Sequence, residues 1–172
     1  MKGPMPVILH LSQDDPRKCS ARKMARFGKA RLIDRFHDIT HGSLLLDPFS
    51  KVALSPADKG ILLTRGLMAV DCSWEDAERV FFKIKKIQRM ENRALPLLLA
   101  TNPVKFGKWG ELSTLEAIAA SYFIMGYKED AIDMMRLYNW GANFIDINRE
   151  PLEAYSECRN STEVVEVQKE FI

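Results

Sequence analysis

From residue 51 onward, short apolar runs alternate with amphipathic stretches, and this alternation limits the folds open to the chain. Residues 67–70 and 95–100 have the apolar composition of buried strands, whereas residues 56–65 and 75–91 have helical periodicity. Apolar strands that alternate with amphipathic helices form a mainly parallel sheet with helices on both faces. The predicted fold class is therefore α/β.

Capping signals predict where two of the helices begin. Ser55 suits an N-cap and Pro56 the first helical position. Ser113 and Glu116 have the spacing of a capping box, which opens a helix that runs to Gly126. Two more helices are predicted at residues 128–139 and 150–158.

The first third of the chain has weaker signals. Residues 6–11 are apolar and precede a polar turn at residues 12–16, which predicts a strand followed by a turn. A helix capped by Ser20 follows, and a further strand is predicted at residues 44–46. We expect a small basic N-terminal domain over residues 1–48, and a larger domain over residues 49–172.

The charges are unevenly distributed although the net charge is only +2. Residues 17–35 carry eight basic side chains and one acid, whereas residues 129–172 carry ten acids and four bases. Such a basic cluster either attracts polyanions or simply solvates a helix face.

Several classes of protein are excluded by length and composition. No apolar run among the 172 residues approaches the roughly 20 needed to cross a bilayer, so we expect no membrane partner. The N-terminus lacks the apolar region of a secretory signal. Three widely spaced cysteines argue against a disulfide framework, which favours a reducing cytoplasm.

The common nucleotide and metal motifs are missing. The sequence contains neither a P-loop nor a G-x-G-x-x-G fingerprint. His37 and His41 are four residues apart, but Gly42 follows and no partner has zinc spacing, so we expect no metal site and interpret both as loop histidines.

The residues after the strand at 67–70 are the strongest candidates for chemistry, because ligands in parallel sheets bind outside the carboxyl ends of the strands. Asp71 could accept a proton or bind a hydroxyl, and Trp74 could form the wall of an apolar pocket. The alternative is that Asp71 caps the next helix while Trp74 packs in the core. Cys72 is either a nucleophile or, as we expect, a small buried apolar residue.

Five motifs occur in a fixed order along the chain. They are Asp15-Pro16-Arg17-Lys18-Cys19-Ser20, Leu54-Ser55-Pro56-Ala57-Asp58, Val70-Asp71-Cys72-Ser73-Trp74, Leu95-Pro96-x-Leu98-x-Ala100-x-Asn102-Pro103-Val104 and Leu112-Ser113-x-x-Glu116-Ala117. Together they closely resemble the ribosome-biogenesis aminocarboxypropyltransferases that modify small-subunit ribosomal RNA, and the resemblance covers roughly residues 6–155. The lack of a long charged tail is similar to the compact archaeal members.

The resemblance implies a fold and a reaction that the residue pattern alone does not. The fold is SPOUT-like, with a C-terminal trefoil knot after the small N-terminal domain. The family transfers the 3-amino-3-carboxypropyl group of S-adenosylmethionine to N3 of a uridine, an N1-methylpseudouridine, in small-subunit ribosomal RNA. The expected partners are therefore S-adenosylmethionine and this RNA or a pre-ribosomal particle. A monomer is favoured, and the alternative of a dimer stays open.

Site residues follow from the resemblance by motif. Asp71 is the expected catalytic residue, either as the base for the acceptor proton or as a group that orients the ligand. Relatives read N-P-V-N-Y-G-K-P where this chain has Lys105, Phe106 and Trp109 at the differing positions, which weakens the assignment of Gly110. The expected cofactor contacts are Ser20, Val70, Trp74, Leu95, Trp109, Gly110 and Thr114.

The basic segment is expected to bind the RNA phosphates. Its proposed contacts are Lys18, Arg22, Lys23, Arg26 and Lys29. Two other functions stay open: an RNA methyltransferase with the same fold, which would transfer a different carbon of the sulfonium, and a non-catalytic ribosome-assembly factor that binds RNA without S-adenosylmethionine.

Overall fold

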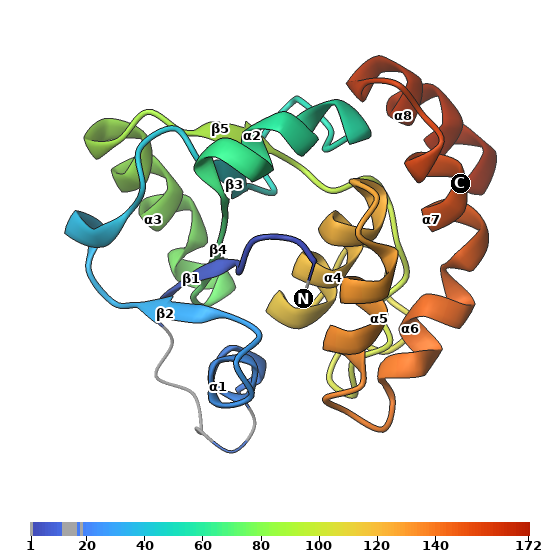
Figure 1. Cartoon of the computed structure of the whole chain (residues 1–172), viewed down its shortest axis with the longest axis horizontal. Helices are drawn as coiled ribbons and strands as arrows, with labels where there is room; N and C mark the ends of the chain where they lie inside the picture. The colour runs from blue at the N-terminus through green and yellow to red at the C-terminus, as the bar shows by residue number, and fades with distance from the viewer. Residues whose placement is uncertain (1, 12–16, 18) are drawn as a thin grey trace.

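The protein forms one five-stranded sheet with helices packed around it, as Figure 1 shows. This computed structural model describes residues 2–11, 17 and 19–172. The strands run in the order β2-β1-β4-β3-β5, and each neighbouring pair is parallel. Their bounds are β1 (Val7–His10), β2 (Arg31–Ile33), β3 (Leu44–Leu46), β4 (Leu67–Asp71) and β5 (Glu91–Arg93).

Helices cover both faces of the sheet, which confirms the predicted α/β class. On one face α3 (Trp74–Ile87) packs its Val80 and Ile84 against alternate strand residues such as Leu9 and Met68. The neighbouring strand residues point the other way, as the two-residue period of a strand requires. That opposite face is covered by α1 (Ser20–Arg26), α2 (Lys59–Arg65) and α4 (Thr114–Ile124).

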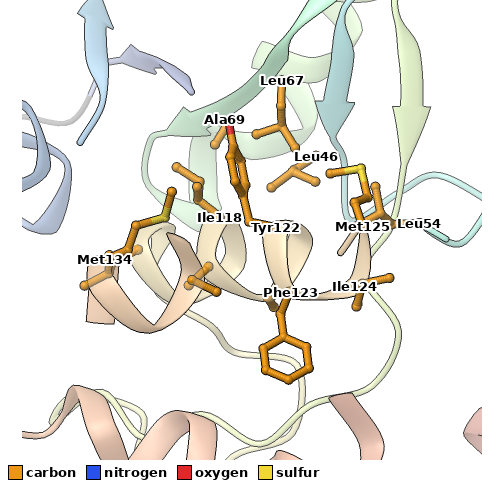
Figure 2. Close-up of a cluster of buried hydrophobic side chains, with 14 of the residues drawn as sticks. Leu46, Leu54, Leu67, Ala69, Ile118, Tyr122, Phe123, Ile124, Met125 and Met134 are labelled. Carbon is orange, nitrogen blue, oxygen red and sulfur yellow. The ribbon is translucent and has the colours of Figure 1, made fainter. Parts of the chain in front are cut away.

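Helix α4 is buried along most of its length because it lies between the sheet and the C-terminal helices. In Figure 2, Tyr122 and Ile118 point from α4 toward Leu67 and Ala69, while Phe123 points to the opposite side of the helix. The outer layer consists of α5 (Lys128–Met135), α6 (Gly141–Ile147), α7 (Arg149–Ser156) and α8 (Ser161–Gln168). Short 3-10 helices span Phe36–Asp38, Pro56–Asp58 and Lys169–Phe171.

The prediction of a strand at residues 95–100 is wrong. The segment is extended and partly buried, but its backbone pairing is limited to a few hydrogen bonds with residues 107–110 around the isolated bridge of Leu99 with Trp109. Side chains from the C-terminal part of the chain form further hydrogen bonds with its backbone. The amide of Leu97 donates to Gln168 Oε1 (2.7 Å), and the Tyr155 hydroxyl donates to the Leu97 carbonyl (2.9 Å). Asn148 accepts from the Leu99 amide (2.8 Å) and donates to its carbonyl (2.9 Å).

Smaller differences concern the ends of elements. Ser20 is the first residue of α1, and Cys19 occupies the N-cap without a side-chain bond, so the predicted cap is wrong by one residue. Strands β2 and β5 were not predicted, and the helix predicted at residues 75–91 ends at Ile87, before β5 begins. The predicted turn at residues 12–16 lies outside the described residues. The boundary at residue 48 stays a prediction, and strands from both sides of it share the sheet.

The predicted capping signals are confirmed. Ser55 accepts from the Ala57 amide and Ser113 from the Glu116 amide, each with a reciprocal acidic partner. Among the described residues, no helix has the length and apolar character needed to span a membrane.

Because Asn148 replaces a strand partner for the 95–100 segment, we expect Asn148→Leu to destabilise the protein. The change leaves the amide and carbonyl of Leu99 without their partners, at about 1–3 kcal/mol for each unsatisfied buried group. Urea unfolding followed by circular dichroism measures the effect. Asn143→Leu, at an exposed position on α6, the helix that Asn148 directly follows, is the control. Equal stability of the two variants would contradict this account.

Candidate functional site

A cavity of about 500 Å³ opens beside the carboxyl ends of β3 and β4. This is where open parallel sheets usually bind ligands. Asp71 and most of the predicted cofactor contacts line this cavity. Trp109 is the exception, since it is not one of the described residues that line the cavity. Those that line it are Ser20, Val70, Asp71, Trp74, Leu95, Gly110 and Thr114.

Strand β4 and the first turn of α3 form one side of the cavity. Val70 and Asp71 end the strand, and Ser73 caps α3 by accepting from the Asp76 amide (3.3 Å). Trp74 is the first residue of the helix and is 61% exposed while lining the cavity. The alternative in which Asp71 is the cap and Trp74 packs in the core is therefore wrong.

Asp71 belongs to a hydrogen-bond network that the sequence analysis missed. His10 ends β1 in register with Asp71, and its Nδ1 lies 2.7 Å from Asp71 Oδ2. The guanidinium of Arg22 donates from Nε to His10 Nε2 (3.2 Å). Since arginine can only donate, His10 Nε2 accepts and its Nδ1–H donates to the carboxylate. The network thus connects α1 to the cavity.

His10, Cys19 and Asp71 also have the side-chain types of a metal site, with potential ligand atoms within 4.8 Å of one another. Hydrogen bonds account for the arrangement, because Cys19 Sγ donates to Asp71 Oδ2 (3.5 Å) and His10 is bonded at both ring nitrogens. The histidines weighed earlier do not share a helix: His37 lies in a 3-10 turn, and His41 lies beyond its end.

Residues 95–97 and 110–114 form the facing side of the cavity, and the carboxylate of Glu116 fixes it in place. Glu116 is fully buried. Its Oε1 accepts from the amides of Thr101 (2.8 Å) and Asn102 (2.9 Å) and from the Thr101 hydroxyl (3.1 Å). Its Oε2 accepts from Asn102 Nδ2 (2.8 Å) and the Ser113 amide (2.7 Å). Thr101 and Asn102 follow the 95–100 segment and bind Glu116, so they support the wall without lining the cavity.

Asp47 is a second carboxylate of the cavity that the sequence analysis did not single out. It follows β3 and is buried, with Oδ1 accepting from the Phe49 amide (2.8 Å) and Oδ2 from Asn92 Nδ2 (2.7 Å). The sequence did contain a signal, because Asp47 follows a predicted strand just as Asp71 does.

The cavity also contains two thiols. Burial raises the pKa of both Cys19 and Cys72, and the negative charge of Asp71 raises both further. A backbone hydrogen bond from Arg22 partly offsets the rise at Cys19. A raised pKa keeps a thiol protonated and poorly nucleophilic. This agrees with the expectation that Cys72 is not a nucleophile.

The basic residues of α1 differ in their surroundings. Arg22 and Arg26 are exposed. Lys23 lies over the ring of Tyr138, 4.0 Å from its centroid, and Lys29 pairs with Asp133. Lys18 lies outside the described residues.

Known proteins resemble this chain over nearly all of its length. The family described as "Ribosome biogenesis protein, C-terminal" matches residues 44–172. The chain is 50% identical to a 16S rRNA aminocarboxypropyltransferase of Methanosarcina mazei, covering 96% of this chain and 93% of that protein. It is 43% identical to the protein of that name from Methanocaldococcus jannaschii, covering 98% and 96%.

A solved structure agrees with these sequences. The SAM-dependent rRNA:acp-transferase Tsr3 from Vulcanisaeta distributa superposes with a TM-score of 0.85 at 43% identity, covering 98% of this chain and 95% of that chain. A second family, described as a possible Fer4-like domain in RNase L inhibitor, matches residues 7–35. That segment contains one cysteine, whereas iron–sulfur clusters are usually held by four.

The raised pKa values of Cys19 and Cys72 predict slow alkylation near neutral pH. At about pH 8, close to the ordinary thiol pKa of about 8.5, we expect iodoacetamide to react with both more slowly than with the urea-unfolded chain. A higher pKa moves thiolate formation to higher pH. The alkylation rate of the folded protein should therefore keep rising above the pH at which the rate for the unfolded thiols reaches its plateau. Peptide mass spectrometry follows each cysteine. Identical pH profiles for folded and unfolded protein would contradict the prediction.

Proposed function

Since this chain belongs to the family of the archaeal 16S rRNA aminocarboxypropyltransferases, we propose that it transfers the 3-amino-3-carboxypropyl group of S-adenosylmethionine to small-subunit ribosomal RNA. The observation that carries the proposal is the full-length likeness, in sequence and fold, to a SAM-dependent transferase. Family membership is what the five sequence motifs indicated.

The cavity has the properties that S-adenosylmethionine requires. Its volume of about 500 Å³ lies within the roughly 300–1,000 Å³ of small-molecule sites. Asp71 provides a carboxylate for the cationic donor, and Val70 and Leu95 provide apolar surface. The N-terminus of α4, at Ser113 and Thr114, lies at the wall, where a helix dipole favours a carboxylate such as that of the amino-acid arm.

The choice of transferred group depends on orientation. When bound, S-adenosylmethionine supplies a sulfonium whose three attached carbons are all electrophilic. Holding one carbon in line with the acceptor lowers the activation free energy by several kcal/mol. We assign Trp74, Val70 and Leu95 to holding the methyl side in apolar surroundings, which leaves the aminocarboxypropyl arm open to the acceptor.

Asp71 acts on the acceptor in one of two ways. The acceptor nitrogen loses its proton as the new N–C bond forms and the S–C bond breaks. Asp71 either takes that proton or orients the acceptor while water takes it. Either role needs a fixed carboxylate, and the hydrogen bonds from His10 and Cys19 to its Oδ2 hold it.

The finer expectations from the resemblance belong to the same proposal. The acceptor is N3 of an N1-methylpseudouridine, reached in ribosomal RNA or a pre-ribosomal particle in the cytoplasm by a monomeric enzyme. The fold includes a SPOUT-like trefoil knot in the C-terminal part and a separate domain at residues 1–48. Exposure of Arg22 and Arg26 supports a phosphate-binding role for the basic N-terminal segment. The proposed contacts in that segment are Lys18, Arg22, Lys23, Arg26 and Lys29.

Mass analysis of RNA after reaction tests the proposed function. Purified protein, small-subunit RNA and S-adenosylmethionine should give an RNA fragment heavier by one aminocarboxypropyl group, with calorimetry showing binding of S-adenosylmethionine. A gain of one methyl group would instead make the protein a methyltransferase. RNA binding without any affinity for S-adenosylmethionine would favour an assembly factor. Omitting the donor is the control.

Replacing the site carboxylate should slow transfer more than it weakens donor binding. We expect Asp71→Asn to reduce the single-turnover rate at least about tenfold, below the 10²–10⁴ typical of acid–base groups because water can partly substitute. Affinity for S-adenosylmethionine, measured by calorimetry, should change less. Asp146→Asn, at an exposed position on α6, is the matched control. An unchanged rate would remove Asp71 from the mechanism.

A further inference from the structure

Exposed apolar side chains gather in one short loop next to the cavity. In this loop, residues 103–109, called the rim loop below, Val104 is 84% exposed, Phe106 62% and Trp109 49%. Large apolar side chains exposed together usually mark a binding surface.

The rim loop is held in shape, so the exposure of its side chains is not a result of looseness. The Gly107 amide donates to the Ala100 carbonyl (2.8 Å), and the Ala100 amide donates to the Lys108 carbonyl (2.9 Å). The Lys105 amide donates to Asn102 Oδ1 (2.9 Å), and Asn102 itself is bound to Glu116. Gly107 has a φ of +81°, a conformation that other residues rarely adopt. Phe106 and Trp109 are therefore presented to solvent by a fixed backbone.

The charges of the rim loop suit a polyanion. Lys105 and Lys108 alternate with the exposed apolar residues. Lys108 is exposed, while Lys105 forms an ion pair with Glu111 (2.8 Å). Aromatic side chains interleaved with basic ones are the usual surface for single-stranded nucleic acids, because every base has a face that can stack.

The position of the rim loop fits this partner. Trp109 precedes Gly110, and Gly110 and Leu112 line the cavity. On the proposed function, one uridine must leave its RNA stack to reach the cavity, so its neighbours have to cross the rim. Unstacked bases lose the favourable stacking interactions with their neighbours, and stacking on an aromatic side chain can replace them.

We propose that Phe106 and Trp109 of the rim loop stack unpaired nucleotides next to the target base, with Lys108 near their phosphates. The partner is a single-stranded RNA segment, and the inference rests on the proposed function. The loop then supplies affinity that depends on unpaired bases, in contrast to the charge-dependent affinity of the basic helix.

Binding of a short single-stranded RNA, measured by fluorescence anisotropy at several salt concentrations, tests the proposal. We expect Phe106→Ala to weaken binding about tenfold, the size expected for one stacked base, with little change in salt dependence. Lys108→Gln should instead reduce the salt slope by about 0.7 log units per log unit. Phe106→Tyr should retain binding. Phe82→Ala, at a 60% exposed position on α3, is the matched control.

Three outcomes would overturn the proposal. The first is equal RNA affinity of Phe106→Ala and Phe82→Ala. The second is an equal loss of affinity for a fully paired duplex, which would exclude stacking. The third is a wild-type dimer in sedimentation that Phe106→Ala dissociates, which would make the rim loop a contact between two copies. The assay needs no chemistry, so failure of the transferase reaction leaves it interpretable, and unchanged binding of S-adenosylmethionine shows that the variants fold.

Discussion

The carboxylate of Glu116 is fully buried and accepts five hydrogen bonds, all from residues 101, 102 and 113. A buried charge is costly unless its lone pairs are satisfied, so these donors have to meet at one point. These hydrogen bonds hold the 101–113 segment against the start of α4. They thereby fix the positions of the cavity wall at residues 110–114 and of the base of the rim loop. The position of the site therefore depends on a side chain that does not line it.

The two sides of the cavity are built differently. Strand β4 is held by regular pairing with β1 and β3, and this pairing places Asp71 next to His10. The facing segment, residues 95–100, has no such ladder and relies on side chains from α7, from α8 and from Asn148, which lies between α6 and α7. The C-terminal helices thus take the place of a neighbouring strand, which connects the outer layer of the fold directly to the site.

Local signals in the sequence predicted the elements that depend on neighbouring residues. The capping box at Ser113 and the apolar strand before Asp71 are examples, since caps and strand composition act within a few residues. The 95–100 segment shows what local signals cannot predict. Its apolar pattern is that of a strand, but the side chains that bind its backbone lie about 50 to 70 residues away in the sequence. His10 could not be paired with Asp71 because a sequence without strand order does not say which strand ends are neighbours.

On the proposed function, the site has to hold a cationic donor and an anionic RNA close together. Asp47 and Asp71 place negative charge at the cavity, while the basic residues lie on α1 and in the rim loop. Arg22 stands between the two regions, because its Nε donates to His10, which donates to Asp71. A guanidinium has five N–H donors, so Arg22 can keep this bond and still offer others to a phosphate. Arg22, a proposed RNA contact, and the network that fixes the site carboxylate are then parts of one hydrogen-bonded chain.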